Sequence, residues 1–203
     1  MKSYQLFCDM DGVLVNFEGG VLAKMNSIFR LAVEDPSHKL HEVAIACSEE
    51  VGGPDVVLCE KHIEQGLIDD GLPGNVHARA FMKSLIGDDK EMWSNLEWEL
   101  NGKVIWDAIK GVPGIQILSA PMEEGSRLGK RIWCERELAM TGSDVILADS
   151  KAGWGFKDNV LGILIDDRDK YINEFREAGG LAIKHNRKYP EATLSALRAF
   201  GII

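Results

Sequence analysis

The sequence predicts an α/β fold built on a mainly parallel sheet. Short, uninterrupted apolar runs, typical of strands buried on both faces, alternate with segments of helical periodicity. The predicted strands cover residues 4–8, 114–118, 145–148, 162–165 and 181–184. Polar residues follow most of these runs, at the edge where a parallel sheet binds its ligands. Strands that alternate with helices in this way predict right-handed crossover connections.

Three helices are predicted between and after the later strands, over residues 127–140, 169–178 and 190–200. The second stops at Gly179-Gly180, and the third begins with Pro190, whose fixed φ suits a first helical turn. Together with the strands they complete the Rossmann-like part of the fold.

A long segment after the first strand breaks this alternation and reads as helical throughout. Its predicted helices cover residues 18–31, 56–68, 76–86 and 90–100, with glycine- and proline-containing turns at 52–54 and 71–74. We therefore expect an α/β core domain formed by residues 1–16 and 108–203, with a helical cap domain at 17–107.

Composition narrows the class of protein. The 203 residues are 45% hydrophobic and 27% charged, with a net charge of −9, which disfavours duplex nucleic acid as a partner. The chain has no apolar run long enough to cross a membrane, and its start does not resemble a signal peptide. The cysteines form no disulfide pattern, so a cytoplasmic location is expected; they are Cys8, Cys47, Cys59 and Cys134.

Acidic and hydroxyl side chains follow the predicted strands. Asp9 and Asp11 follow the first, Ser119 the second, and Asp166 with Asp167 the fourth. Because the strands are parallel, these groups should converge at one edge of the sheet. Several carboxylates in one pocket repel each other unless a divalent cation lies among them, and an oxygen-only site suits Mg²⁺.

These motifs resemble those of the haloacid dehalogenase-like superfamily. Residues 9–14, Asp-Met-Asp-Gly-Val-Leu, are similar to its first motif, and residues 117–121, Ile-Leu-Ser-Ala-Pro, to its second. Lys151 would be the third, and residues 165–168, Ile-Asp-Asp-Arg, the fourth. The second and fourth are most similar to the 5'(3')-deoxyribonucleotidase-like branch. The resemblance spans roughly residues 4–16 and 105–185 and leaves out the helical segment.

The resemblance implies a role for each motif. Asp9 would be the nucleophile that forms an aspartyl-phosphate, and Asp11 the general acid and base. Ser119 and Lys151 would bind the phosphoryl group. Mg²⁺ would be held by Asp9, by Asp11 through its backbone carbonyl, by Asp167 directly and by Asp166 through water; these last two roles are assigned by analogy.

Two choices stay open at this stage. Lys157 competes with Lys151 for the phosphate-binding role, and Lys130 is either a site lysine or an exposed helix lysine. Aromatic residues of the helical segment are candidate walls for a nucleotide base, with Phe17 and Trp93 first and Phe81 and Trp98 as further candidates. Each could equally fill the interior of the cap.

The expected function is that of a Mg²⁺-dependent phosphomonoesterase for a small-molecule substrate, a nucleoside monophosphate, cleaved as by a 5'-nucleotidase or deoxyribonucleotidase. Two alternatives remain. One is a phosphatase for sugar phosphates or another small metabolite, and the other is a catalytically idle module that binds phosphate or nucleotide.

Overall fold

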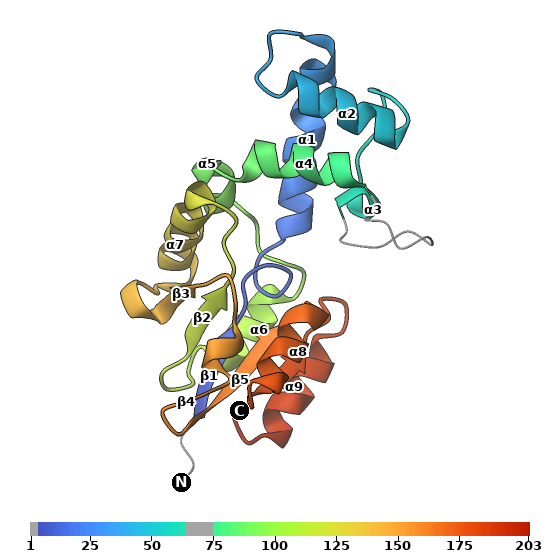
Figure 1. Ribbon diagram of the computed structural model, residues 1–203. Helices are drawn as coiled ribbons and strands as arrows, with labels where there is room; N and C mark the ends of the chain where they lie inside the picture. Colours follow the sequence, from blue (N-terminus) through green and yellow to red (C-terminus); the bar gives the residue numbers. More distant parts are fainter. Residues whose placement is uncertain (1–3, 64–74) are drawn as a thin grey trace. The chain divides into compact units, whose positions relative to one another are not determined.

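The computed structural model describes residues 4–63 and 75–203. It confirms the α/β class: a sheet in the order β3–β2–β1–β5, with β4 and β6 both on the other edge of β5 (Figure 1). Every pairing is parallel except that of β4 with β5. The strands are β1 Tyr4–Cys8, β2 Gln116–Ser119, β3 Val145–Leu147, β4 Phe156–Lys157, β5 Val160–Asp166 and β6 Leu181–Lys184.

Helices make up most of the remaining described chain. They are α1 Phe17–Glu34, α2 His41–Val51, α3 Glu60–Ile63, α4 Val76–Ile86, α5 Lys90–Ser94, α6 Gly102–Ile109, α7 Glu124–Leu138, α8 Asp169–Glu177 and α9 Pro190–Ala199, with short 3₁₀ turns η1 Gly142–Asp144 and η2 Ala152–Trp154.

The sheet is buried on both faces, as its continuous apolar runs predicted. Phe7 and Leu164 pack against Phe175 of α8, and the Phe7 and Phe175 rings lie 6.3 Å apart, edge to face. The alternate residues Leu6 and Ile163, which point to the opposite face, are equally buried. β1 pairs with β5 over its whole length, from Tyr4 opposite Leu161 to Cys8 opposite Ile165, so the two strands end together and the residues that follow them lie side by side.

The chain divides into two compact units. One consists of the described residues of Met1–Phe17, Ser94–Pro121 and Lys130–Ile203 and contains the sheet. The other consists of the described residues of Glu18–Trp93 and Met122–Gly129 and is helical. The division falls within α7 and assigns residues 94–107 to the sheet unit.

The helical unit has its own interior. The rings of Phe29 and Phe81 lie 5.4 Å apart between α1 and α4. The Glu50 carboxylate accepts hydrogen bonds from the backbone N–H groups of His77 and Ala78, at 3.2 and 2.8 Å, and so satisfies donors in the first turn of α4. These contacts stabilise α4 without a capping side chain of its own.

Two predicted helices are shorter than expected. The helix predicted over 56–68 begins only at Glu60, because the Asn26 side chain bonds both the N–H and the carbonyl of Leu58 and holds that backbone out of a helix. Residues 64–68 and the predicted turn at 71–74 lie outside the described residues. The helix predicted over 90–100 ends at Ser94, because the following residues pair with the loop after β1: Asn16 N–H donates to the Glu97 carbonyl at 2.9 Å.

Candidate functional site

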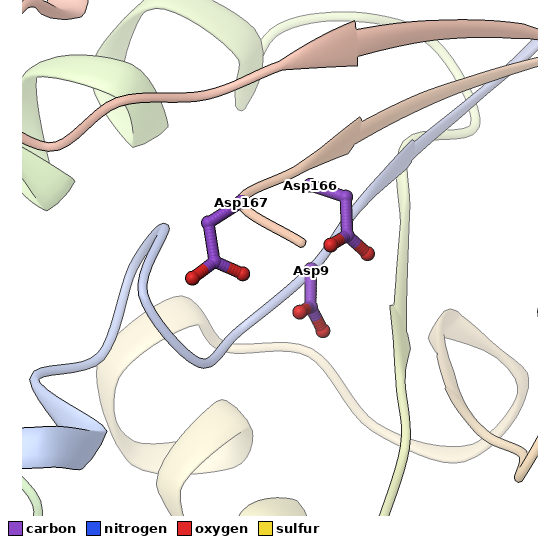
Figure 2. A group of neighbouring side chains, drawn as sticks. All are labelled: Asp9, Asp166 and Asp167. Atoms are coloured by element: carbon purple, nitrogen blue, oxygen red, sulfur yellow. The ribbon is translucent and has the colours of Figure 1, made fainter. Parts of the chain in front are cut away.

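Three aspartates meet at the carboxyl ends of two neighbouring strands (Figure 2). Asp9 follows β1, Asp166 ends β5, and Asp167 comes next in the chain. The pairing of β1 and β5 continues to this point, since the Asp9 N–H donates to the Ile165 carbonyl at 2.9 Å. Each aspartate offers one oxygen, and these oxygens lie within 4.8 Å of one another, a spacing that could hold a metal ion.

Two members of the cluster are buried, Asp167 is half-buried, and the cluster is short of hydrogen-bond donors. Asp9 is 3% exposed and Asp166 is fully buried. Among the side chains of residues 4–63 and 75–203, nothing hydrogen-bonds to Asp9 Oδ1 or Asp167 Oδ1. A buried carboxylate oxygen that accepts no hydrogen bond is costly, and a cation bound between the carboxylates would reduce that cost. The donor set and its geometry therefore fit an oxygen-binding divalent ion.

The pKa values of the cluster reflect this crowding. Burial, together with the charges of Asp9 and Asp166, raises the pKa of Asp167 to about 8. Burial and the charge of Asp9 raise the pKa of Asp166 to about 6, although Lys151 opposes the shift. Near neutral pH, Asp167 therefore keeps a proton unless a cation takes its place.

Lys151 supplies positive charge to the cluster from the segment that follows β3. Its buried Nζ donates to Asp166 Oδ2 at 2.5 Å and lies 2.9 Å from Asp9 Oδ1 as an ion pair, outside hydrogen-bonding geometry. Burial alone would lower its pKa, but the two carboxylates raise it above the ordinary value. Lys157 is exposed on β4, which pairs with the start of β5 at Val160. Only Lys151 of these two lysines contacts the acids.

A second buried lysine, Lys130 of α7, lies beside Asp11. Its Nζ donates to Asp11 Oδ2 at 2.6 Å, to Ser119 Oγ at 2.8 Å and to the Ala120 carbonyl at 3.2 Å. Of the two readings the sequence left open, the exposed one is wrong, since Lys130 is 0% exposed. The sequence feature that could have predicted this burial is the position of Lys130 three residues before Trp133, on the buried face of the helix.

Asp11 pairs with Lys130 beside the three-acid cluster. After burial and the charges of Asp9 and Asp166, the charge of Asp11 also contributes to the raised pKa of Asp167, so Asp11 acts on the cluster electrostatically. Burial raises the pKa of Asp11, and the Lys130 charge opposes this. Its Oδ1 is buried, with no hydrogen bond from the described part of the chain.

Gly12 allows the loop after β1 to approach Asp167. Its φ is +71°, a conformation that L side chains rarely adopt, and a Cβ there would collide with the Asp167 carboxylate. The glycine next to Asp11 is therefore needed both for the turn and for the close approach.

The aromatic candidates for base binding divide by burial. Trp93 is 1% exposed, and its indole N–H donates to the Ile86 carbonyl at 2.7 Å, which satisfies its polar group inside the helical unit. Phe81 is fully buried in the same interior. Phe17 and Trp98 are each partly exposed and belong to the sheet unit. Trp93 and Phe81 thus have the surroundings of core residues.

Among the helices of the described residues, none has the length and apolar character that a membrane span requires.

Comparisons with known proteins give likenesses of fold only. No protein-family model matches the chain, and no curated protein sequence matches it. Among solved structures, a hydrolase from Streptococcus pneumoniae TIGR4 is 14% identical with a TM-score of 0.47, each chain covered completely. A HAD family hydrolase from Deinococcus radiodurans R1, with bound phosphate and sodium, is 17% identical with a TM-score of 0.48, covering 89% of this chain and 80% of that one.

A predicted HAD-like family hydrolase from Porphyromonas gingivalis is 11% identical with a TM-score of 0.48, covering 98% of this chain and 99% of the other. With TM-scores below 0.5, these likenesses decide nothing about the reaction of this chain.

Proposed function

We propose that this chain is a Mg²⁺-dependent phosphomonoesterase of the haloacid dehalogenase-like superfamily that forms an aspartyl-phosphate on Asp9. The observation that carries the proposal is the grouping of Asp9, Asp166 and Asp167 within 4.8 Å. Three grouped carboxylates would repel phosphate in a simple binding module. A hydrolase needs them, because it uses one carboxylate as the nucleophile and the others to hold a metal ion.

The first step transfers the phosphoryl group to the protein. An Asp9 carboxylate oxygen attacks phosphorus while the bond from phosphorus to the ester oxygen breaks. Asp11 donates a proton to the leaving oxygen, which departs as an alcohol. Burial raises the pKa of Asp11, which favours the protonated form that this step needs.

The second step restores the enzyme. Asp11, now a carboxylate, takes a proton from water while the water oxygen attacks phosphorus, and the bond to Asp9 breaks. Orthophosphate and free Asp9 are the products. Because the Lys130 ammonium lies 2.6 Å from Asp11 Oδ2, it is placed to steady Asp11 in its charged form between the two steps.

Two cations and a hydroxyl are available for the phosphoryl oxygens. Lys151 borders Asp9, while Lys130 links Asp11 to the Ser119 hydroxyl at 2.8 Å. Preorganised donors of this kind stabilise the charge that develops in the transition state. We assign phosphate binding to Ser119 and Lys151, as the motifs implied, and add Lys130.

Asp9, Asp167 and the backbone carbonyl of Asp11 would hold the Mg²⁺, with Asp166 contributing through water. When bound, the ion supplies Lewis-acid stabilisation of a phosphoryl oxygen and offsets the repulsion among the carboxylates. The hydrogen bonds that Asp166 already accepts, from Lys151 and from the Arg168 N–H at 2.8 Å, favour the indirect role for it.

We propose a nucleoside monophosphate as the substrate, on the similarity of the second and fourth motifs to nucleotidases. A sugar phosphate is the second candidate, favoured by the burial of Trp93 and Phe81 inside the helical unit. Phe17 and Trp98, both partly exposed, then remain as base-stacking candidates, and the Phe17 N–H donates to the Val15 carbonyl in the loop that also carries Asp11.

The test is phosphate release from a panel of nucleoside monophosphates and sugar phosphates with Mg²⁺. The wild-type chain should hydrolyse at least one member, and Asp9→Asn should lose several orders of magnitude in turnover. Asp107→Asn, an exposed acid in the same unit, serves as the matched control and should keep wild-type turnover. Release by Asp9→Asn at the wild-type rate, or no release from any member of the panel, would overturn the proposal.

A further inference from the structure

The Lys151 ammonium has a third neighbour besides its two carboxylates. Its Nζ lies 4.6 Å from the centroid of the Tyr171 ring, within the range of a cation–π interaction. Lys151 is 0% exposed and Tyr171 is 8% exposed, so water competes little for this contact. Desolvated cation–π contacts are the strong ones.

We propose that Tyr171 is a positioning residue, whose ring helps to hold the Lys151 ammonium at the acid cluster while Asp9 is phosphorylated and released. The inference rests on the proposed function and extends it to a residue outside the four motifs. A lysine side chain has several rotatable bonds and much rotamer entropy to lose, so a fixed ammonium needs more than one contact to hold it.

Besides the hydrogen bond from Lys151 to Asp166, the ring gives the ammonium a contact that does not change with the chemistry of Asp9. In the proposed reaction, Asp9 loses its negative charge when it becomes an acyl phosphate, and its ion pair with Lys151 at 2.9 Å loses strength at that moment. The Tyr171 ring takes no part in the reaction, so its attraction for the ammonium is the same before and after the phosphoryl transfer. Lys151 therefore stays directed at the phosphoryl group throughout both steps.

The ring is itself well anchored. Tyr171 lies on α8 one turn before Phe175, which packs into the sheet against Phe7. Two further cations, those of Arg168 and Lys170, lie 5.8 and 5.4 Å from the same centroid, but both residues are exposed. The buried Lys151 contact is the one that water screens least.

The experiment compares Tyr171→Leu, which removes the aromatic face, with Tyr171→Phe, which keeps it. In wild type and Tyr171→Phe, NMR should show the Lys151 Hε protons shifted upfield by the ring current, and Tyr171→Leu should abolish that shift. In the Mg²⁺-bound protein, Tyr171→Leu should lower kcat/KM and the affinity for inorganic phosphate by about 5–30-fold, and Tyr171→Phe by about twofold at most.

Tyr189→Leu is the matched control, since it removes an exposed tyrosine ring from the same unit. It should leave the Lys151 resonance and the phosphate affinity unchanged. The inference is overturned if Tyr171→Leu leaves either readout at the wild-type value, or if Tyr171→Phe falls as far as Tyr171→Leu. If the wild-type protein hydrolyses no monoester, the proposed function is refuted. The chemical shift of the Lys151 Hε protons and the affinity for inorganic phosphate would still decide the role of Tyr171.

Discussion

At the scale of single residues, two buried lysines give the acids different surroundings. Lys151 forms ion pairs with Asp9 and Asp166. Lys130 forms an ion pair with Asp11 and donates a hydrogen bond to Ser119. In the part of the chain that the structure describes, no lysine pairs with Asp167 in this way, and its pKa is raised to about 8. The site is therefore short of positive charge at one place, beside Asp167, where a metal ion would be most stabilising.

Lys130 can be tested by removing its charge while keeping its length. Lys130→Met leaves Asp11 and Ser119 without their shared donor, and we expect kcat/KM to fall by at least about 100-fold, typical for loss of a preorganised donor to a transition state. Steady-state kinetics on the best substrate measures this. Lys110→Met, an exposed lysine of the sheet unit, should have little effect, and equal losses in the two variants would contradict the assigned role.

Asp167 should act against stability when no metal is bound. Its pKa is about 8 in the folded state and about 3.9 in the unfolded state, so the folded protein binds more protons between these values. The free energy of unfolding therefore falls as pH rises from about 4 to 8. In EDTA at pH 8.5, Asp167→Asn should be more stable by about 1–3 kcal/mol, a gain in Tm of roughly 2–10 °C.

Thermal unfolding of both proteins at pH 4 and pH 8.5 checks this expectation. The difference in stability between the two proteins should disappear at pH 4, because the Asp167 carboxyl of the wild type is neutral there as well. Asp169→Asn, which changes a neighbouring but exposed acid, controls for a general charge effect. If Asp167→Asn is less stable than the wild type at pH 8.5, the inference that positive charge is lacking beside Asp167 is wrong.

Sequence alone named all four of these acids but left the choice of their lysine partners open. Asp9, Asp166 and Asp167 are found from strand ends, because parallel strands bring their carboxyl ends together. The choice between Lys151 and Lys157 depended on β4, a two-residue exposed strand too short to leave a periodic pattern. Lys130 depended on which face of α7 is buried, and Leu128 and Ile132, both exposed, obscured that face.

At the scale of elements, the loop after β1 is tied to the segment between α5 and α6. Val15 bridges to Trp98, and the Glu99 N–H donates to the Leu14 carbonyl at 2.8 Å. A Cβ on Gly102 would press on the Leu14 backbone, so α6 begins against this loop. The loop that carries Asp11 is thus fixed by backbone contacts from a segment far along the chain, within the same unit.

Gly12→Ala tests this loop. The substitution adds a strained φ and a collision with the Asp167 carboxylate, so it should cost about 1–3 kcal/mol of stability and lower kcat/KM at least about tenfold. Gly52→Ala is the matched control: Gly52 has a φ of +102°, but its Cβ would meet nothing within 4 Å. It should lose stability yet keep activity. An active Gly12→Ala protein would show that the close approach to Asp167 is dispensable.

The strands were predictable because burial on both faces leaves continuous apolar runs. β1 and β6 begin and end as predicted, at Tyr4–Cys8 and Leu181–Lys184. Two helices were missed. The segment of α2, His41–Val51, begins without a side-chain cap, and α6 opens with Gly102 after Asn101 in the left-handed conformation. Neither start carries the sequence signal that helix prediction relies on.

At the scale of the whole molecule, the net charge of −9 is consistent with the proposed metal requirement. An acidic protein attracts cations from solution, and the buried cluster concentrates that attraction at one place. The same charge disfavours anionic substrates at long range, so the buried lysines must attract phosphate locally.

The division into a sheet unit and a helical unit leaves all four aspartates and both lysines in the sheet unit. We therefore expect changes in the helical unit, the proposed cap, to alter substrate selectivity more than the reaction.

Metal binding should stabilise the whole protein in a pH-dependent way. At pH 8.5, Mg²⁺ at about 100 times its dissociation constant should raise stability by about 2.7 kcal/mol, or roughly 5–10 °C in Tm, and EDTA should reverse this. As pH falls toward 5.5, protons compete for Asp167 and Asp166, whose pKa values are about 8 and 6, so the gain should shrink. Thermal unfolding across this pH range measures the gain, and calorimetry in buffers of different ionisation enthalpy measures the protons released. Ca²⁺ should support turnover poorly, because its looser coordination misplaces the attacking carboxylate. Asp167→Asn should lose most of the Mg²⁺ gain, so a gain that is independent of pH, or unchanged in that variant, would place the ion elsewhere on the molecule.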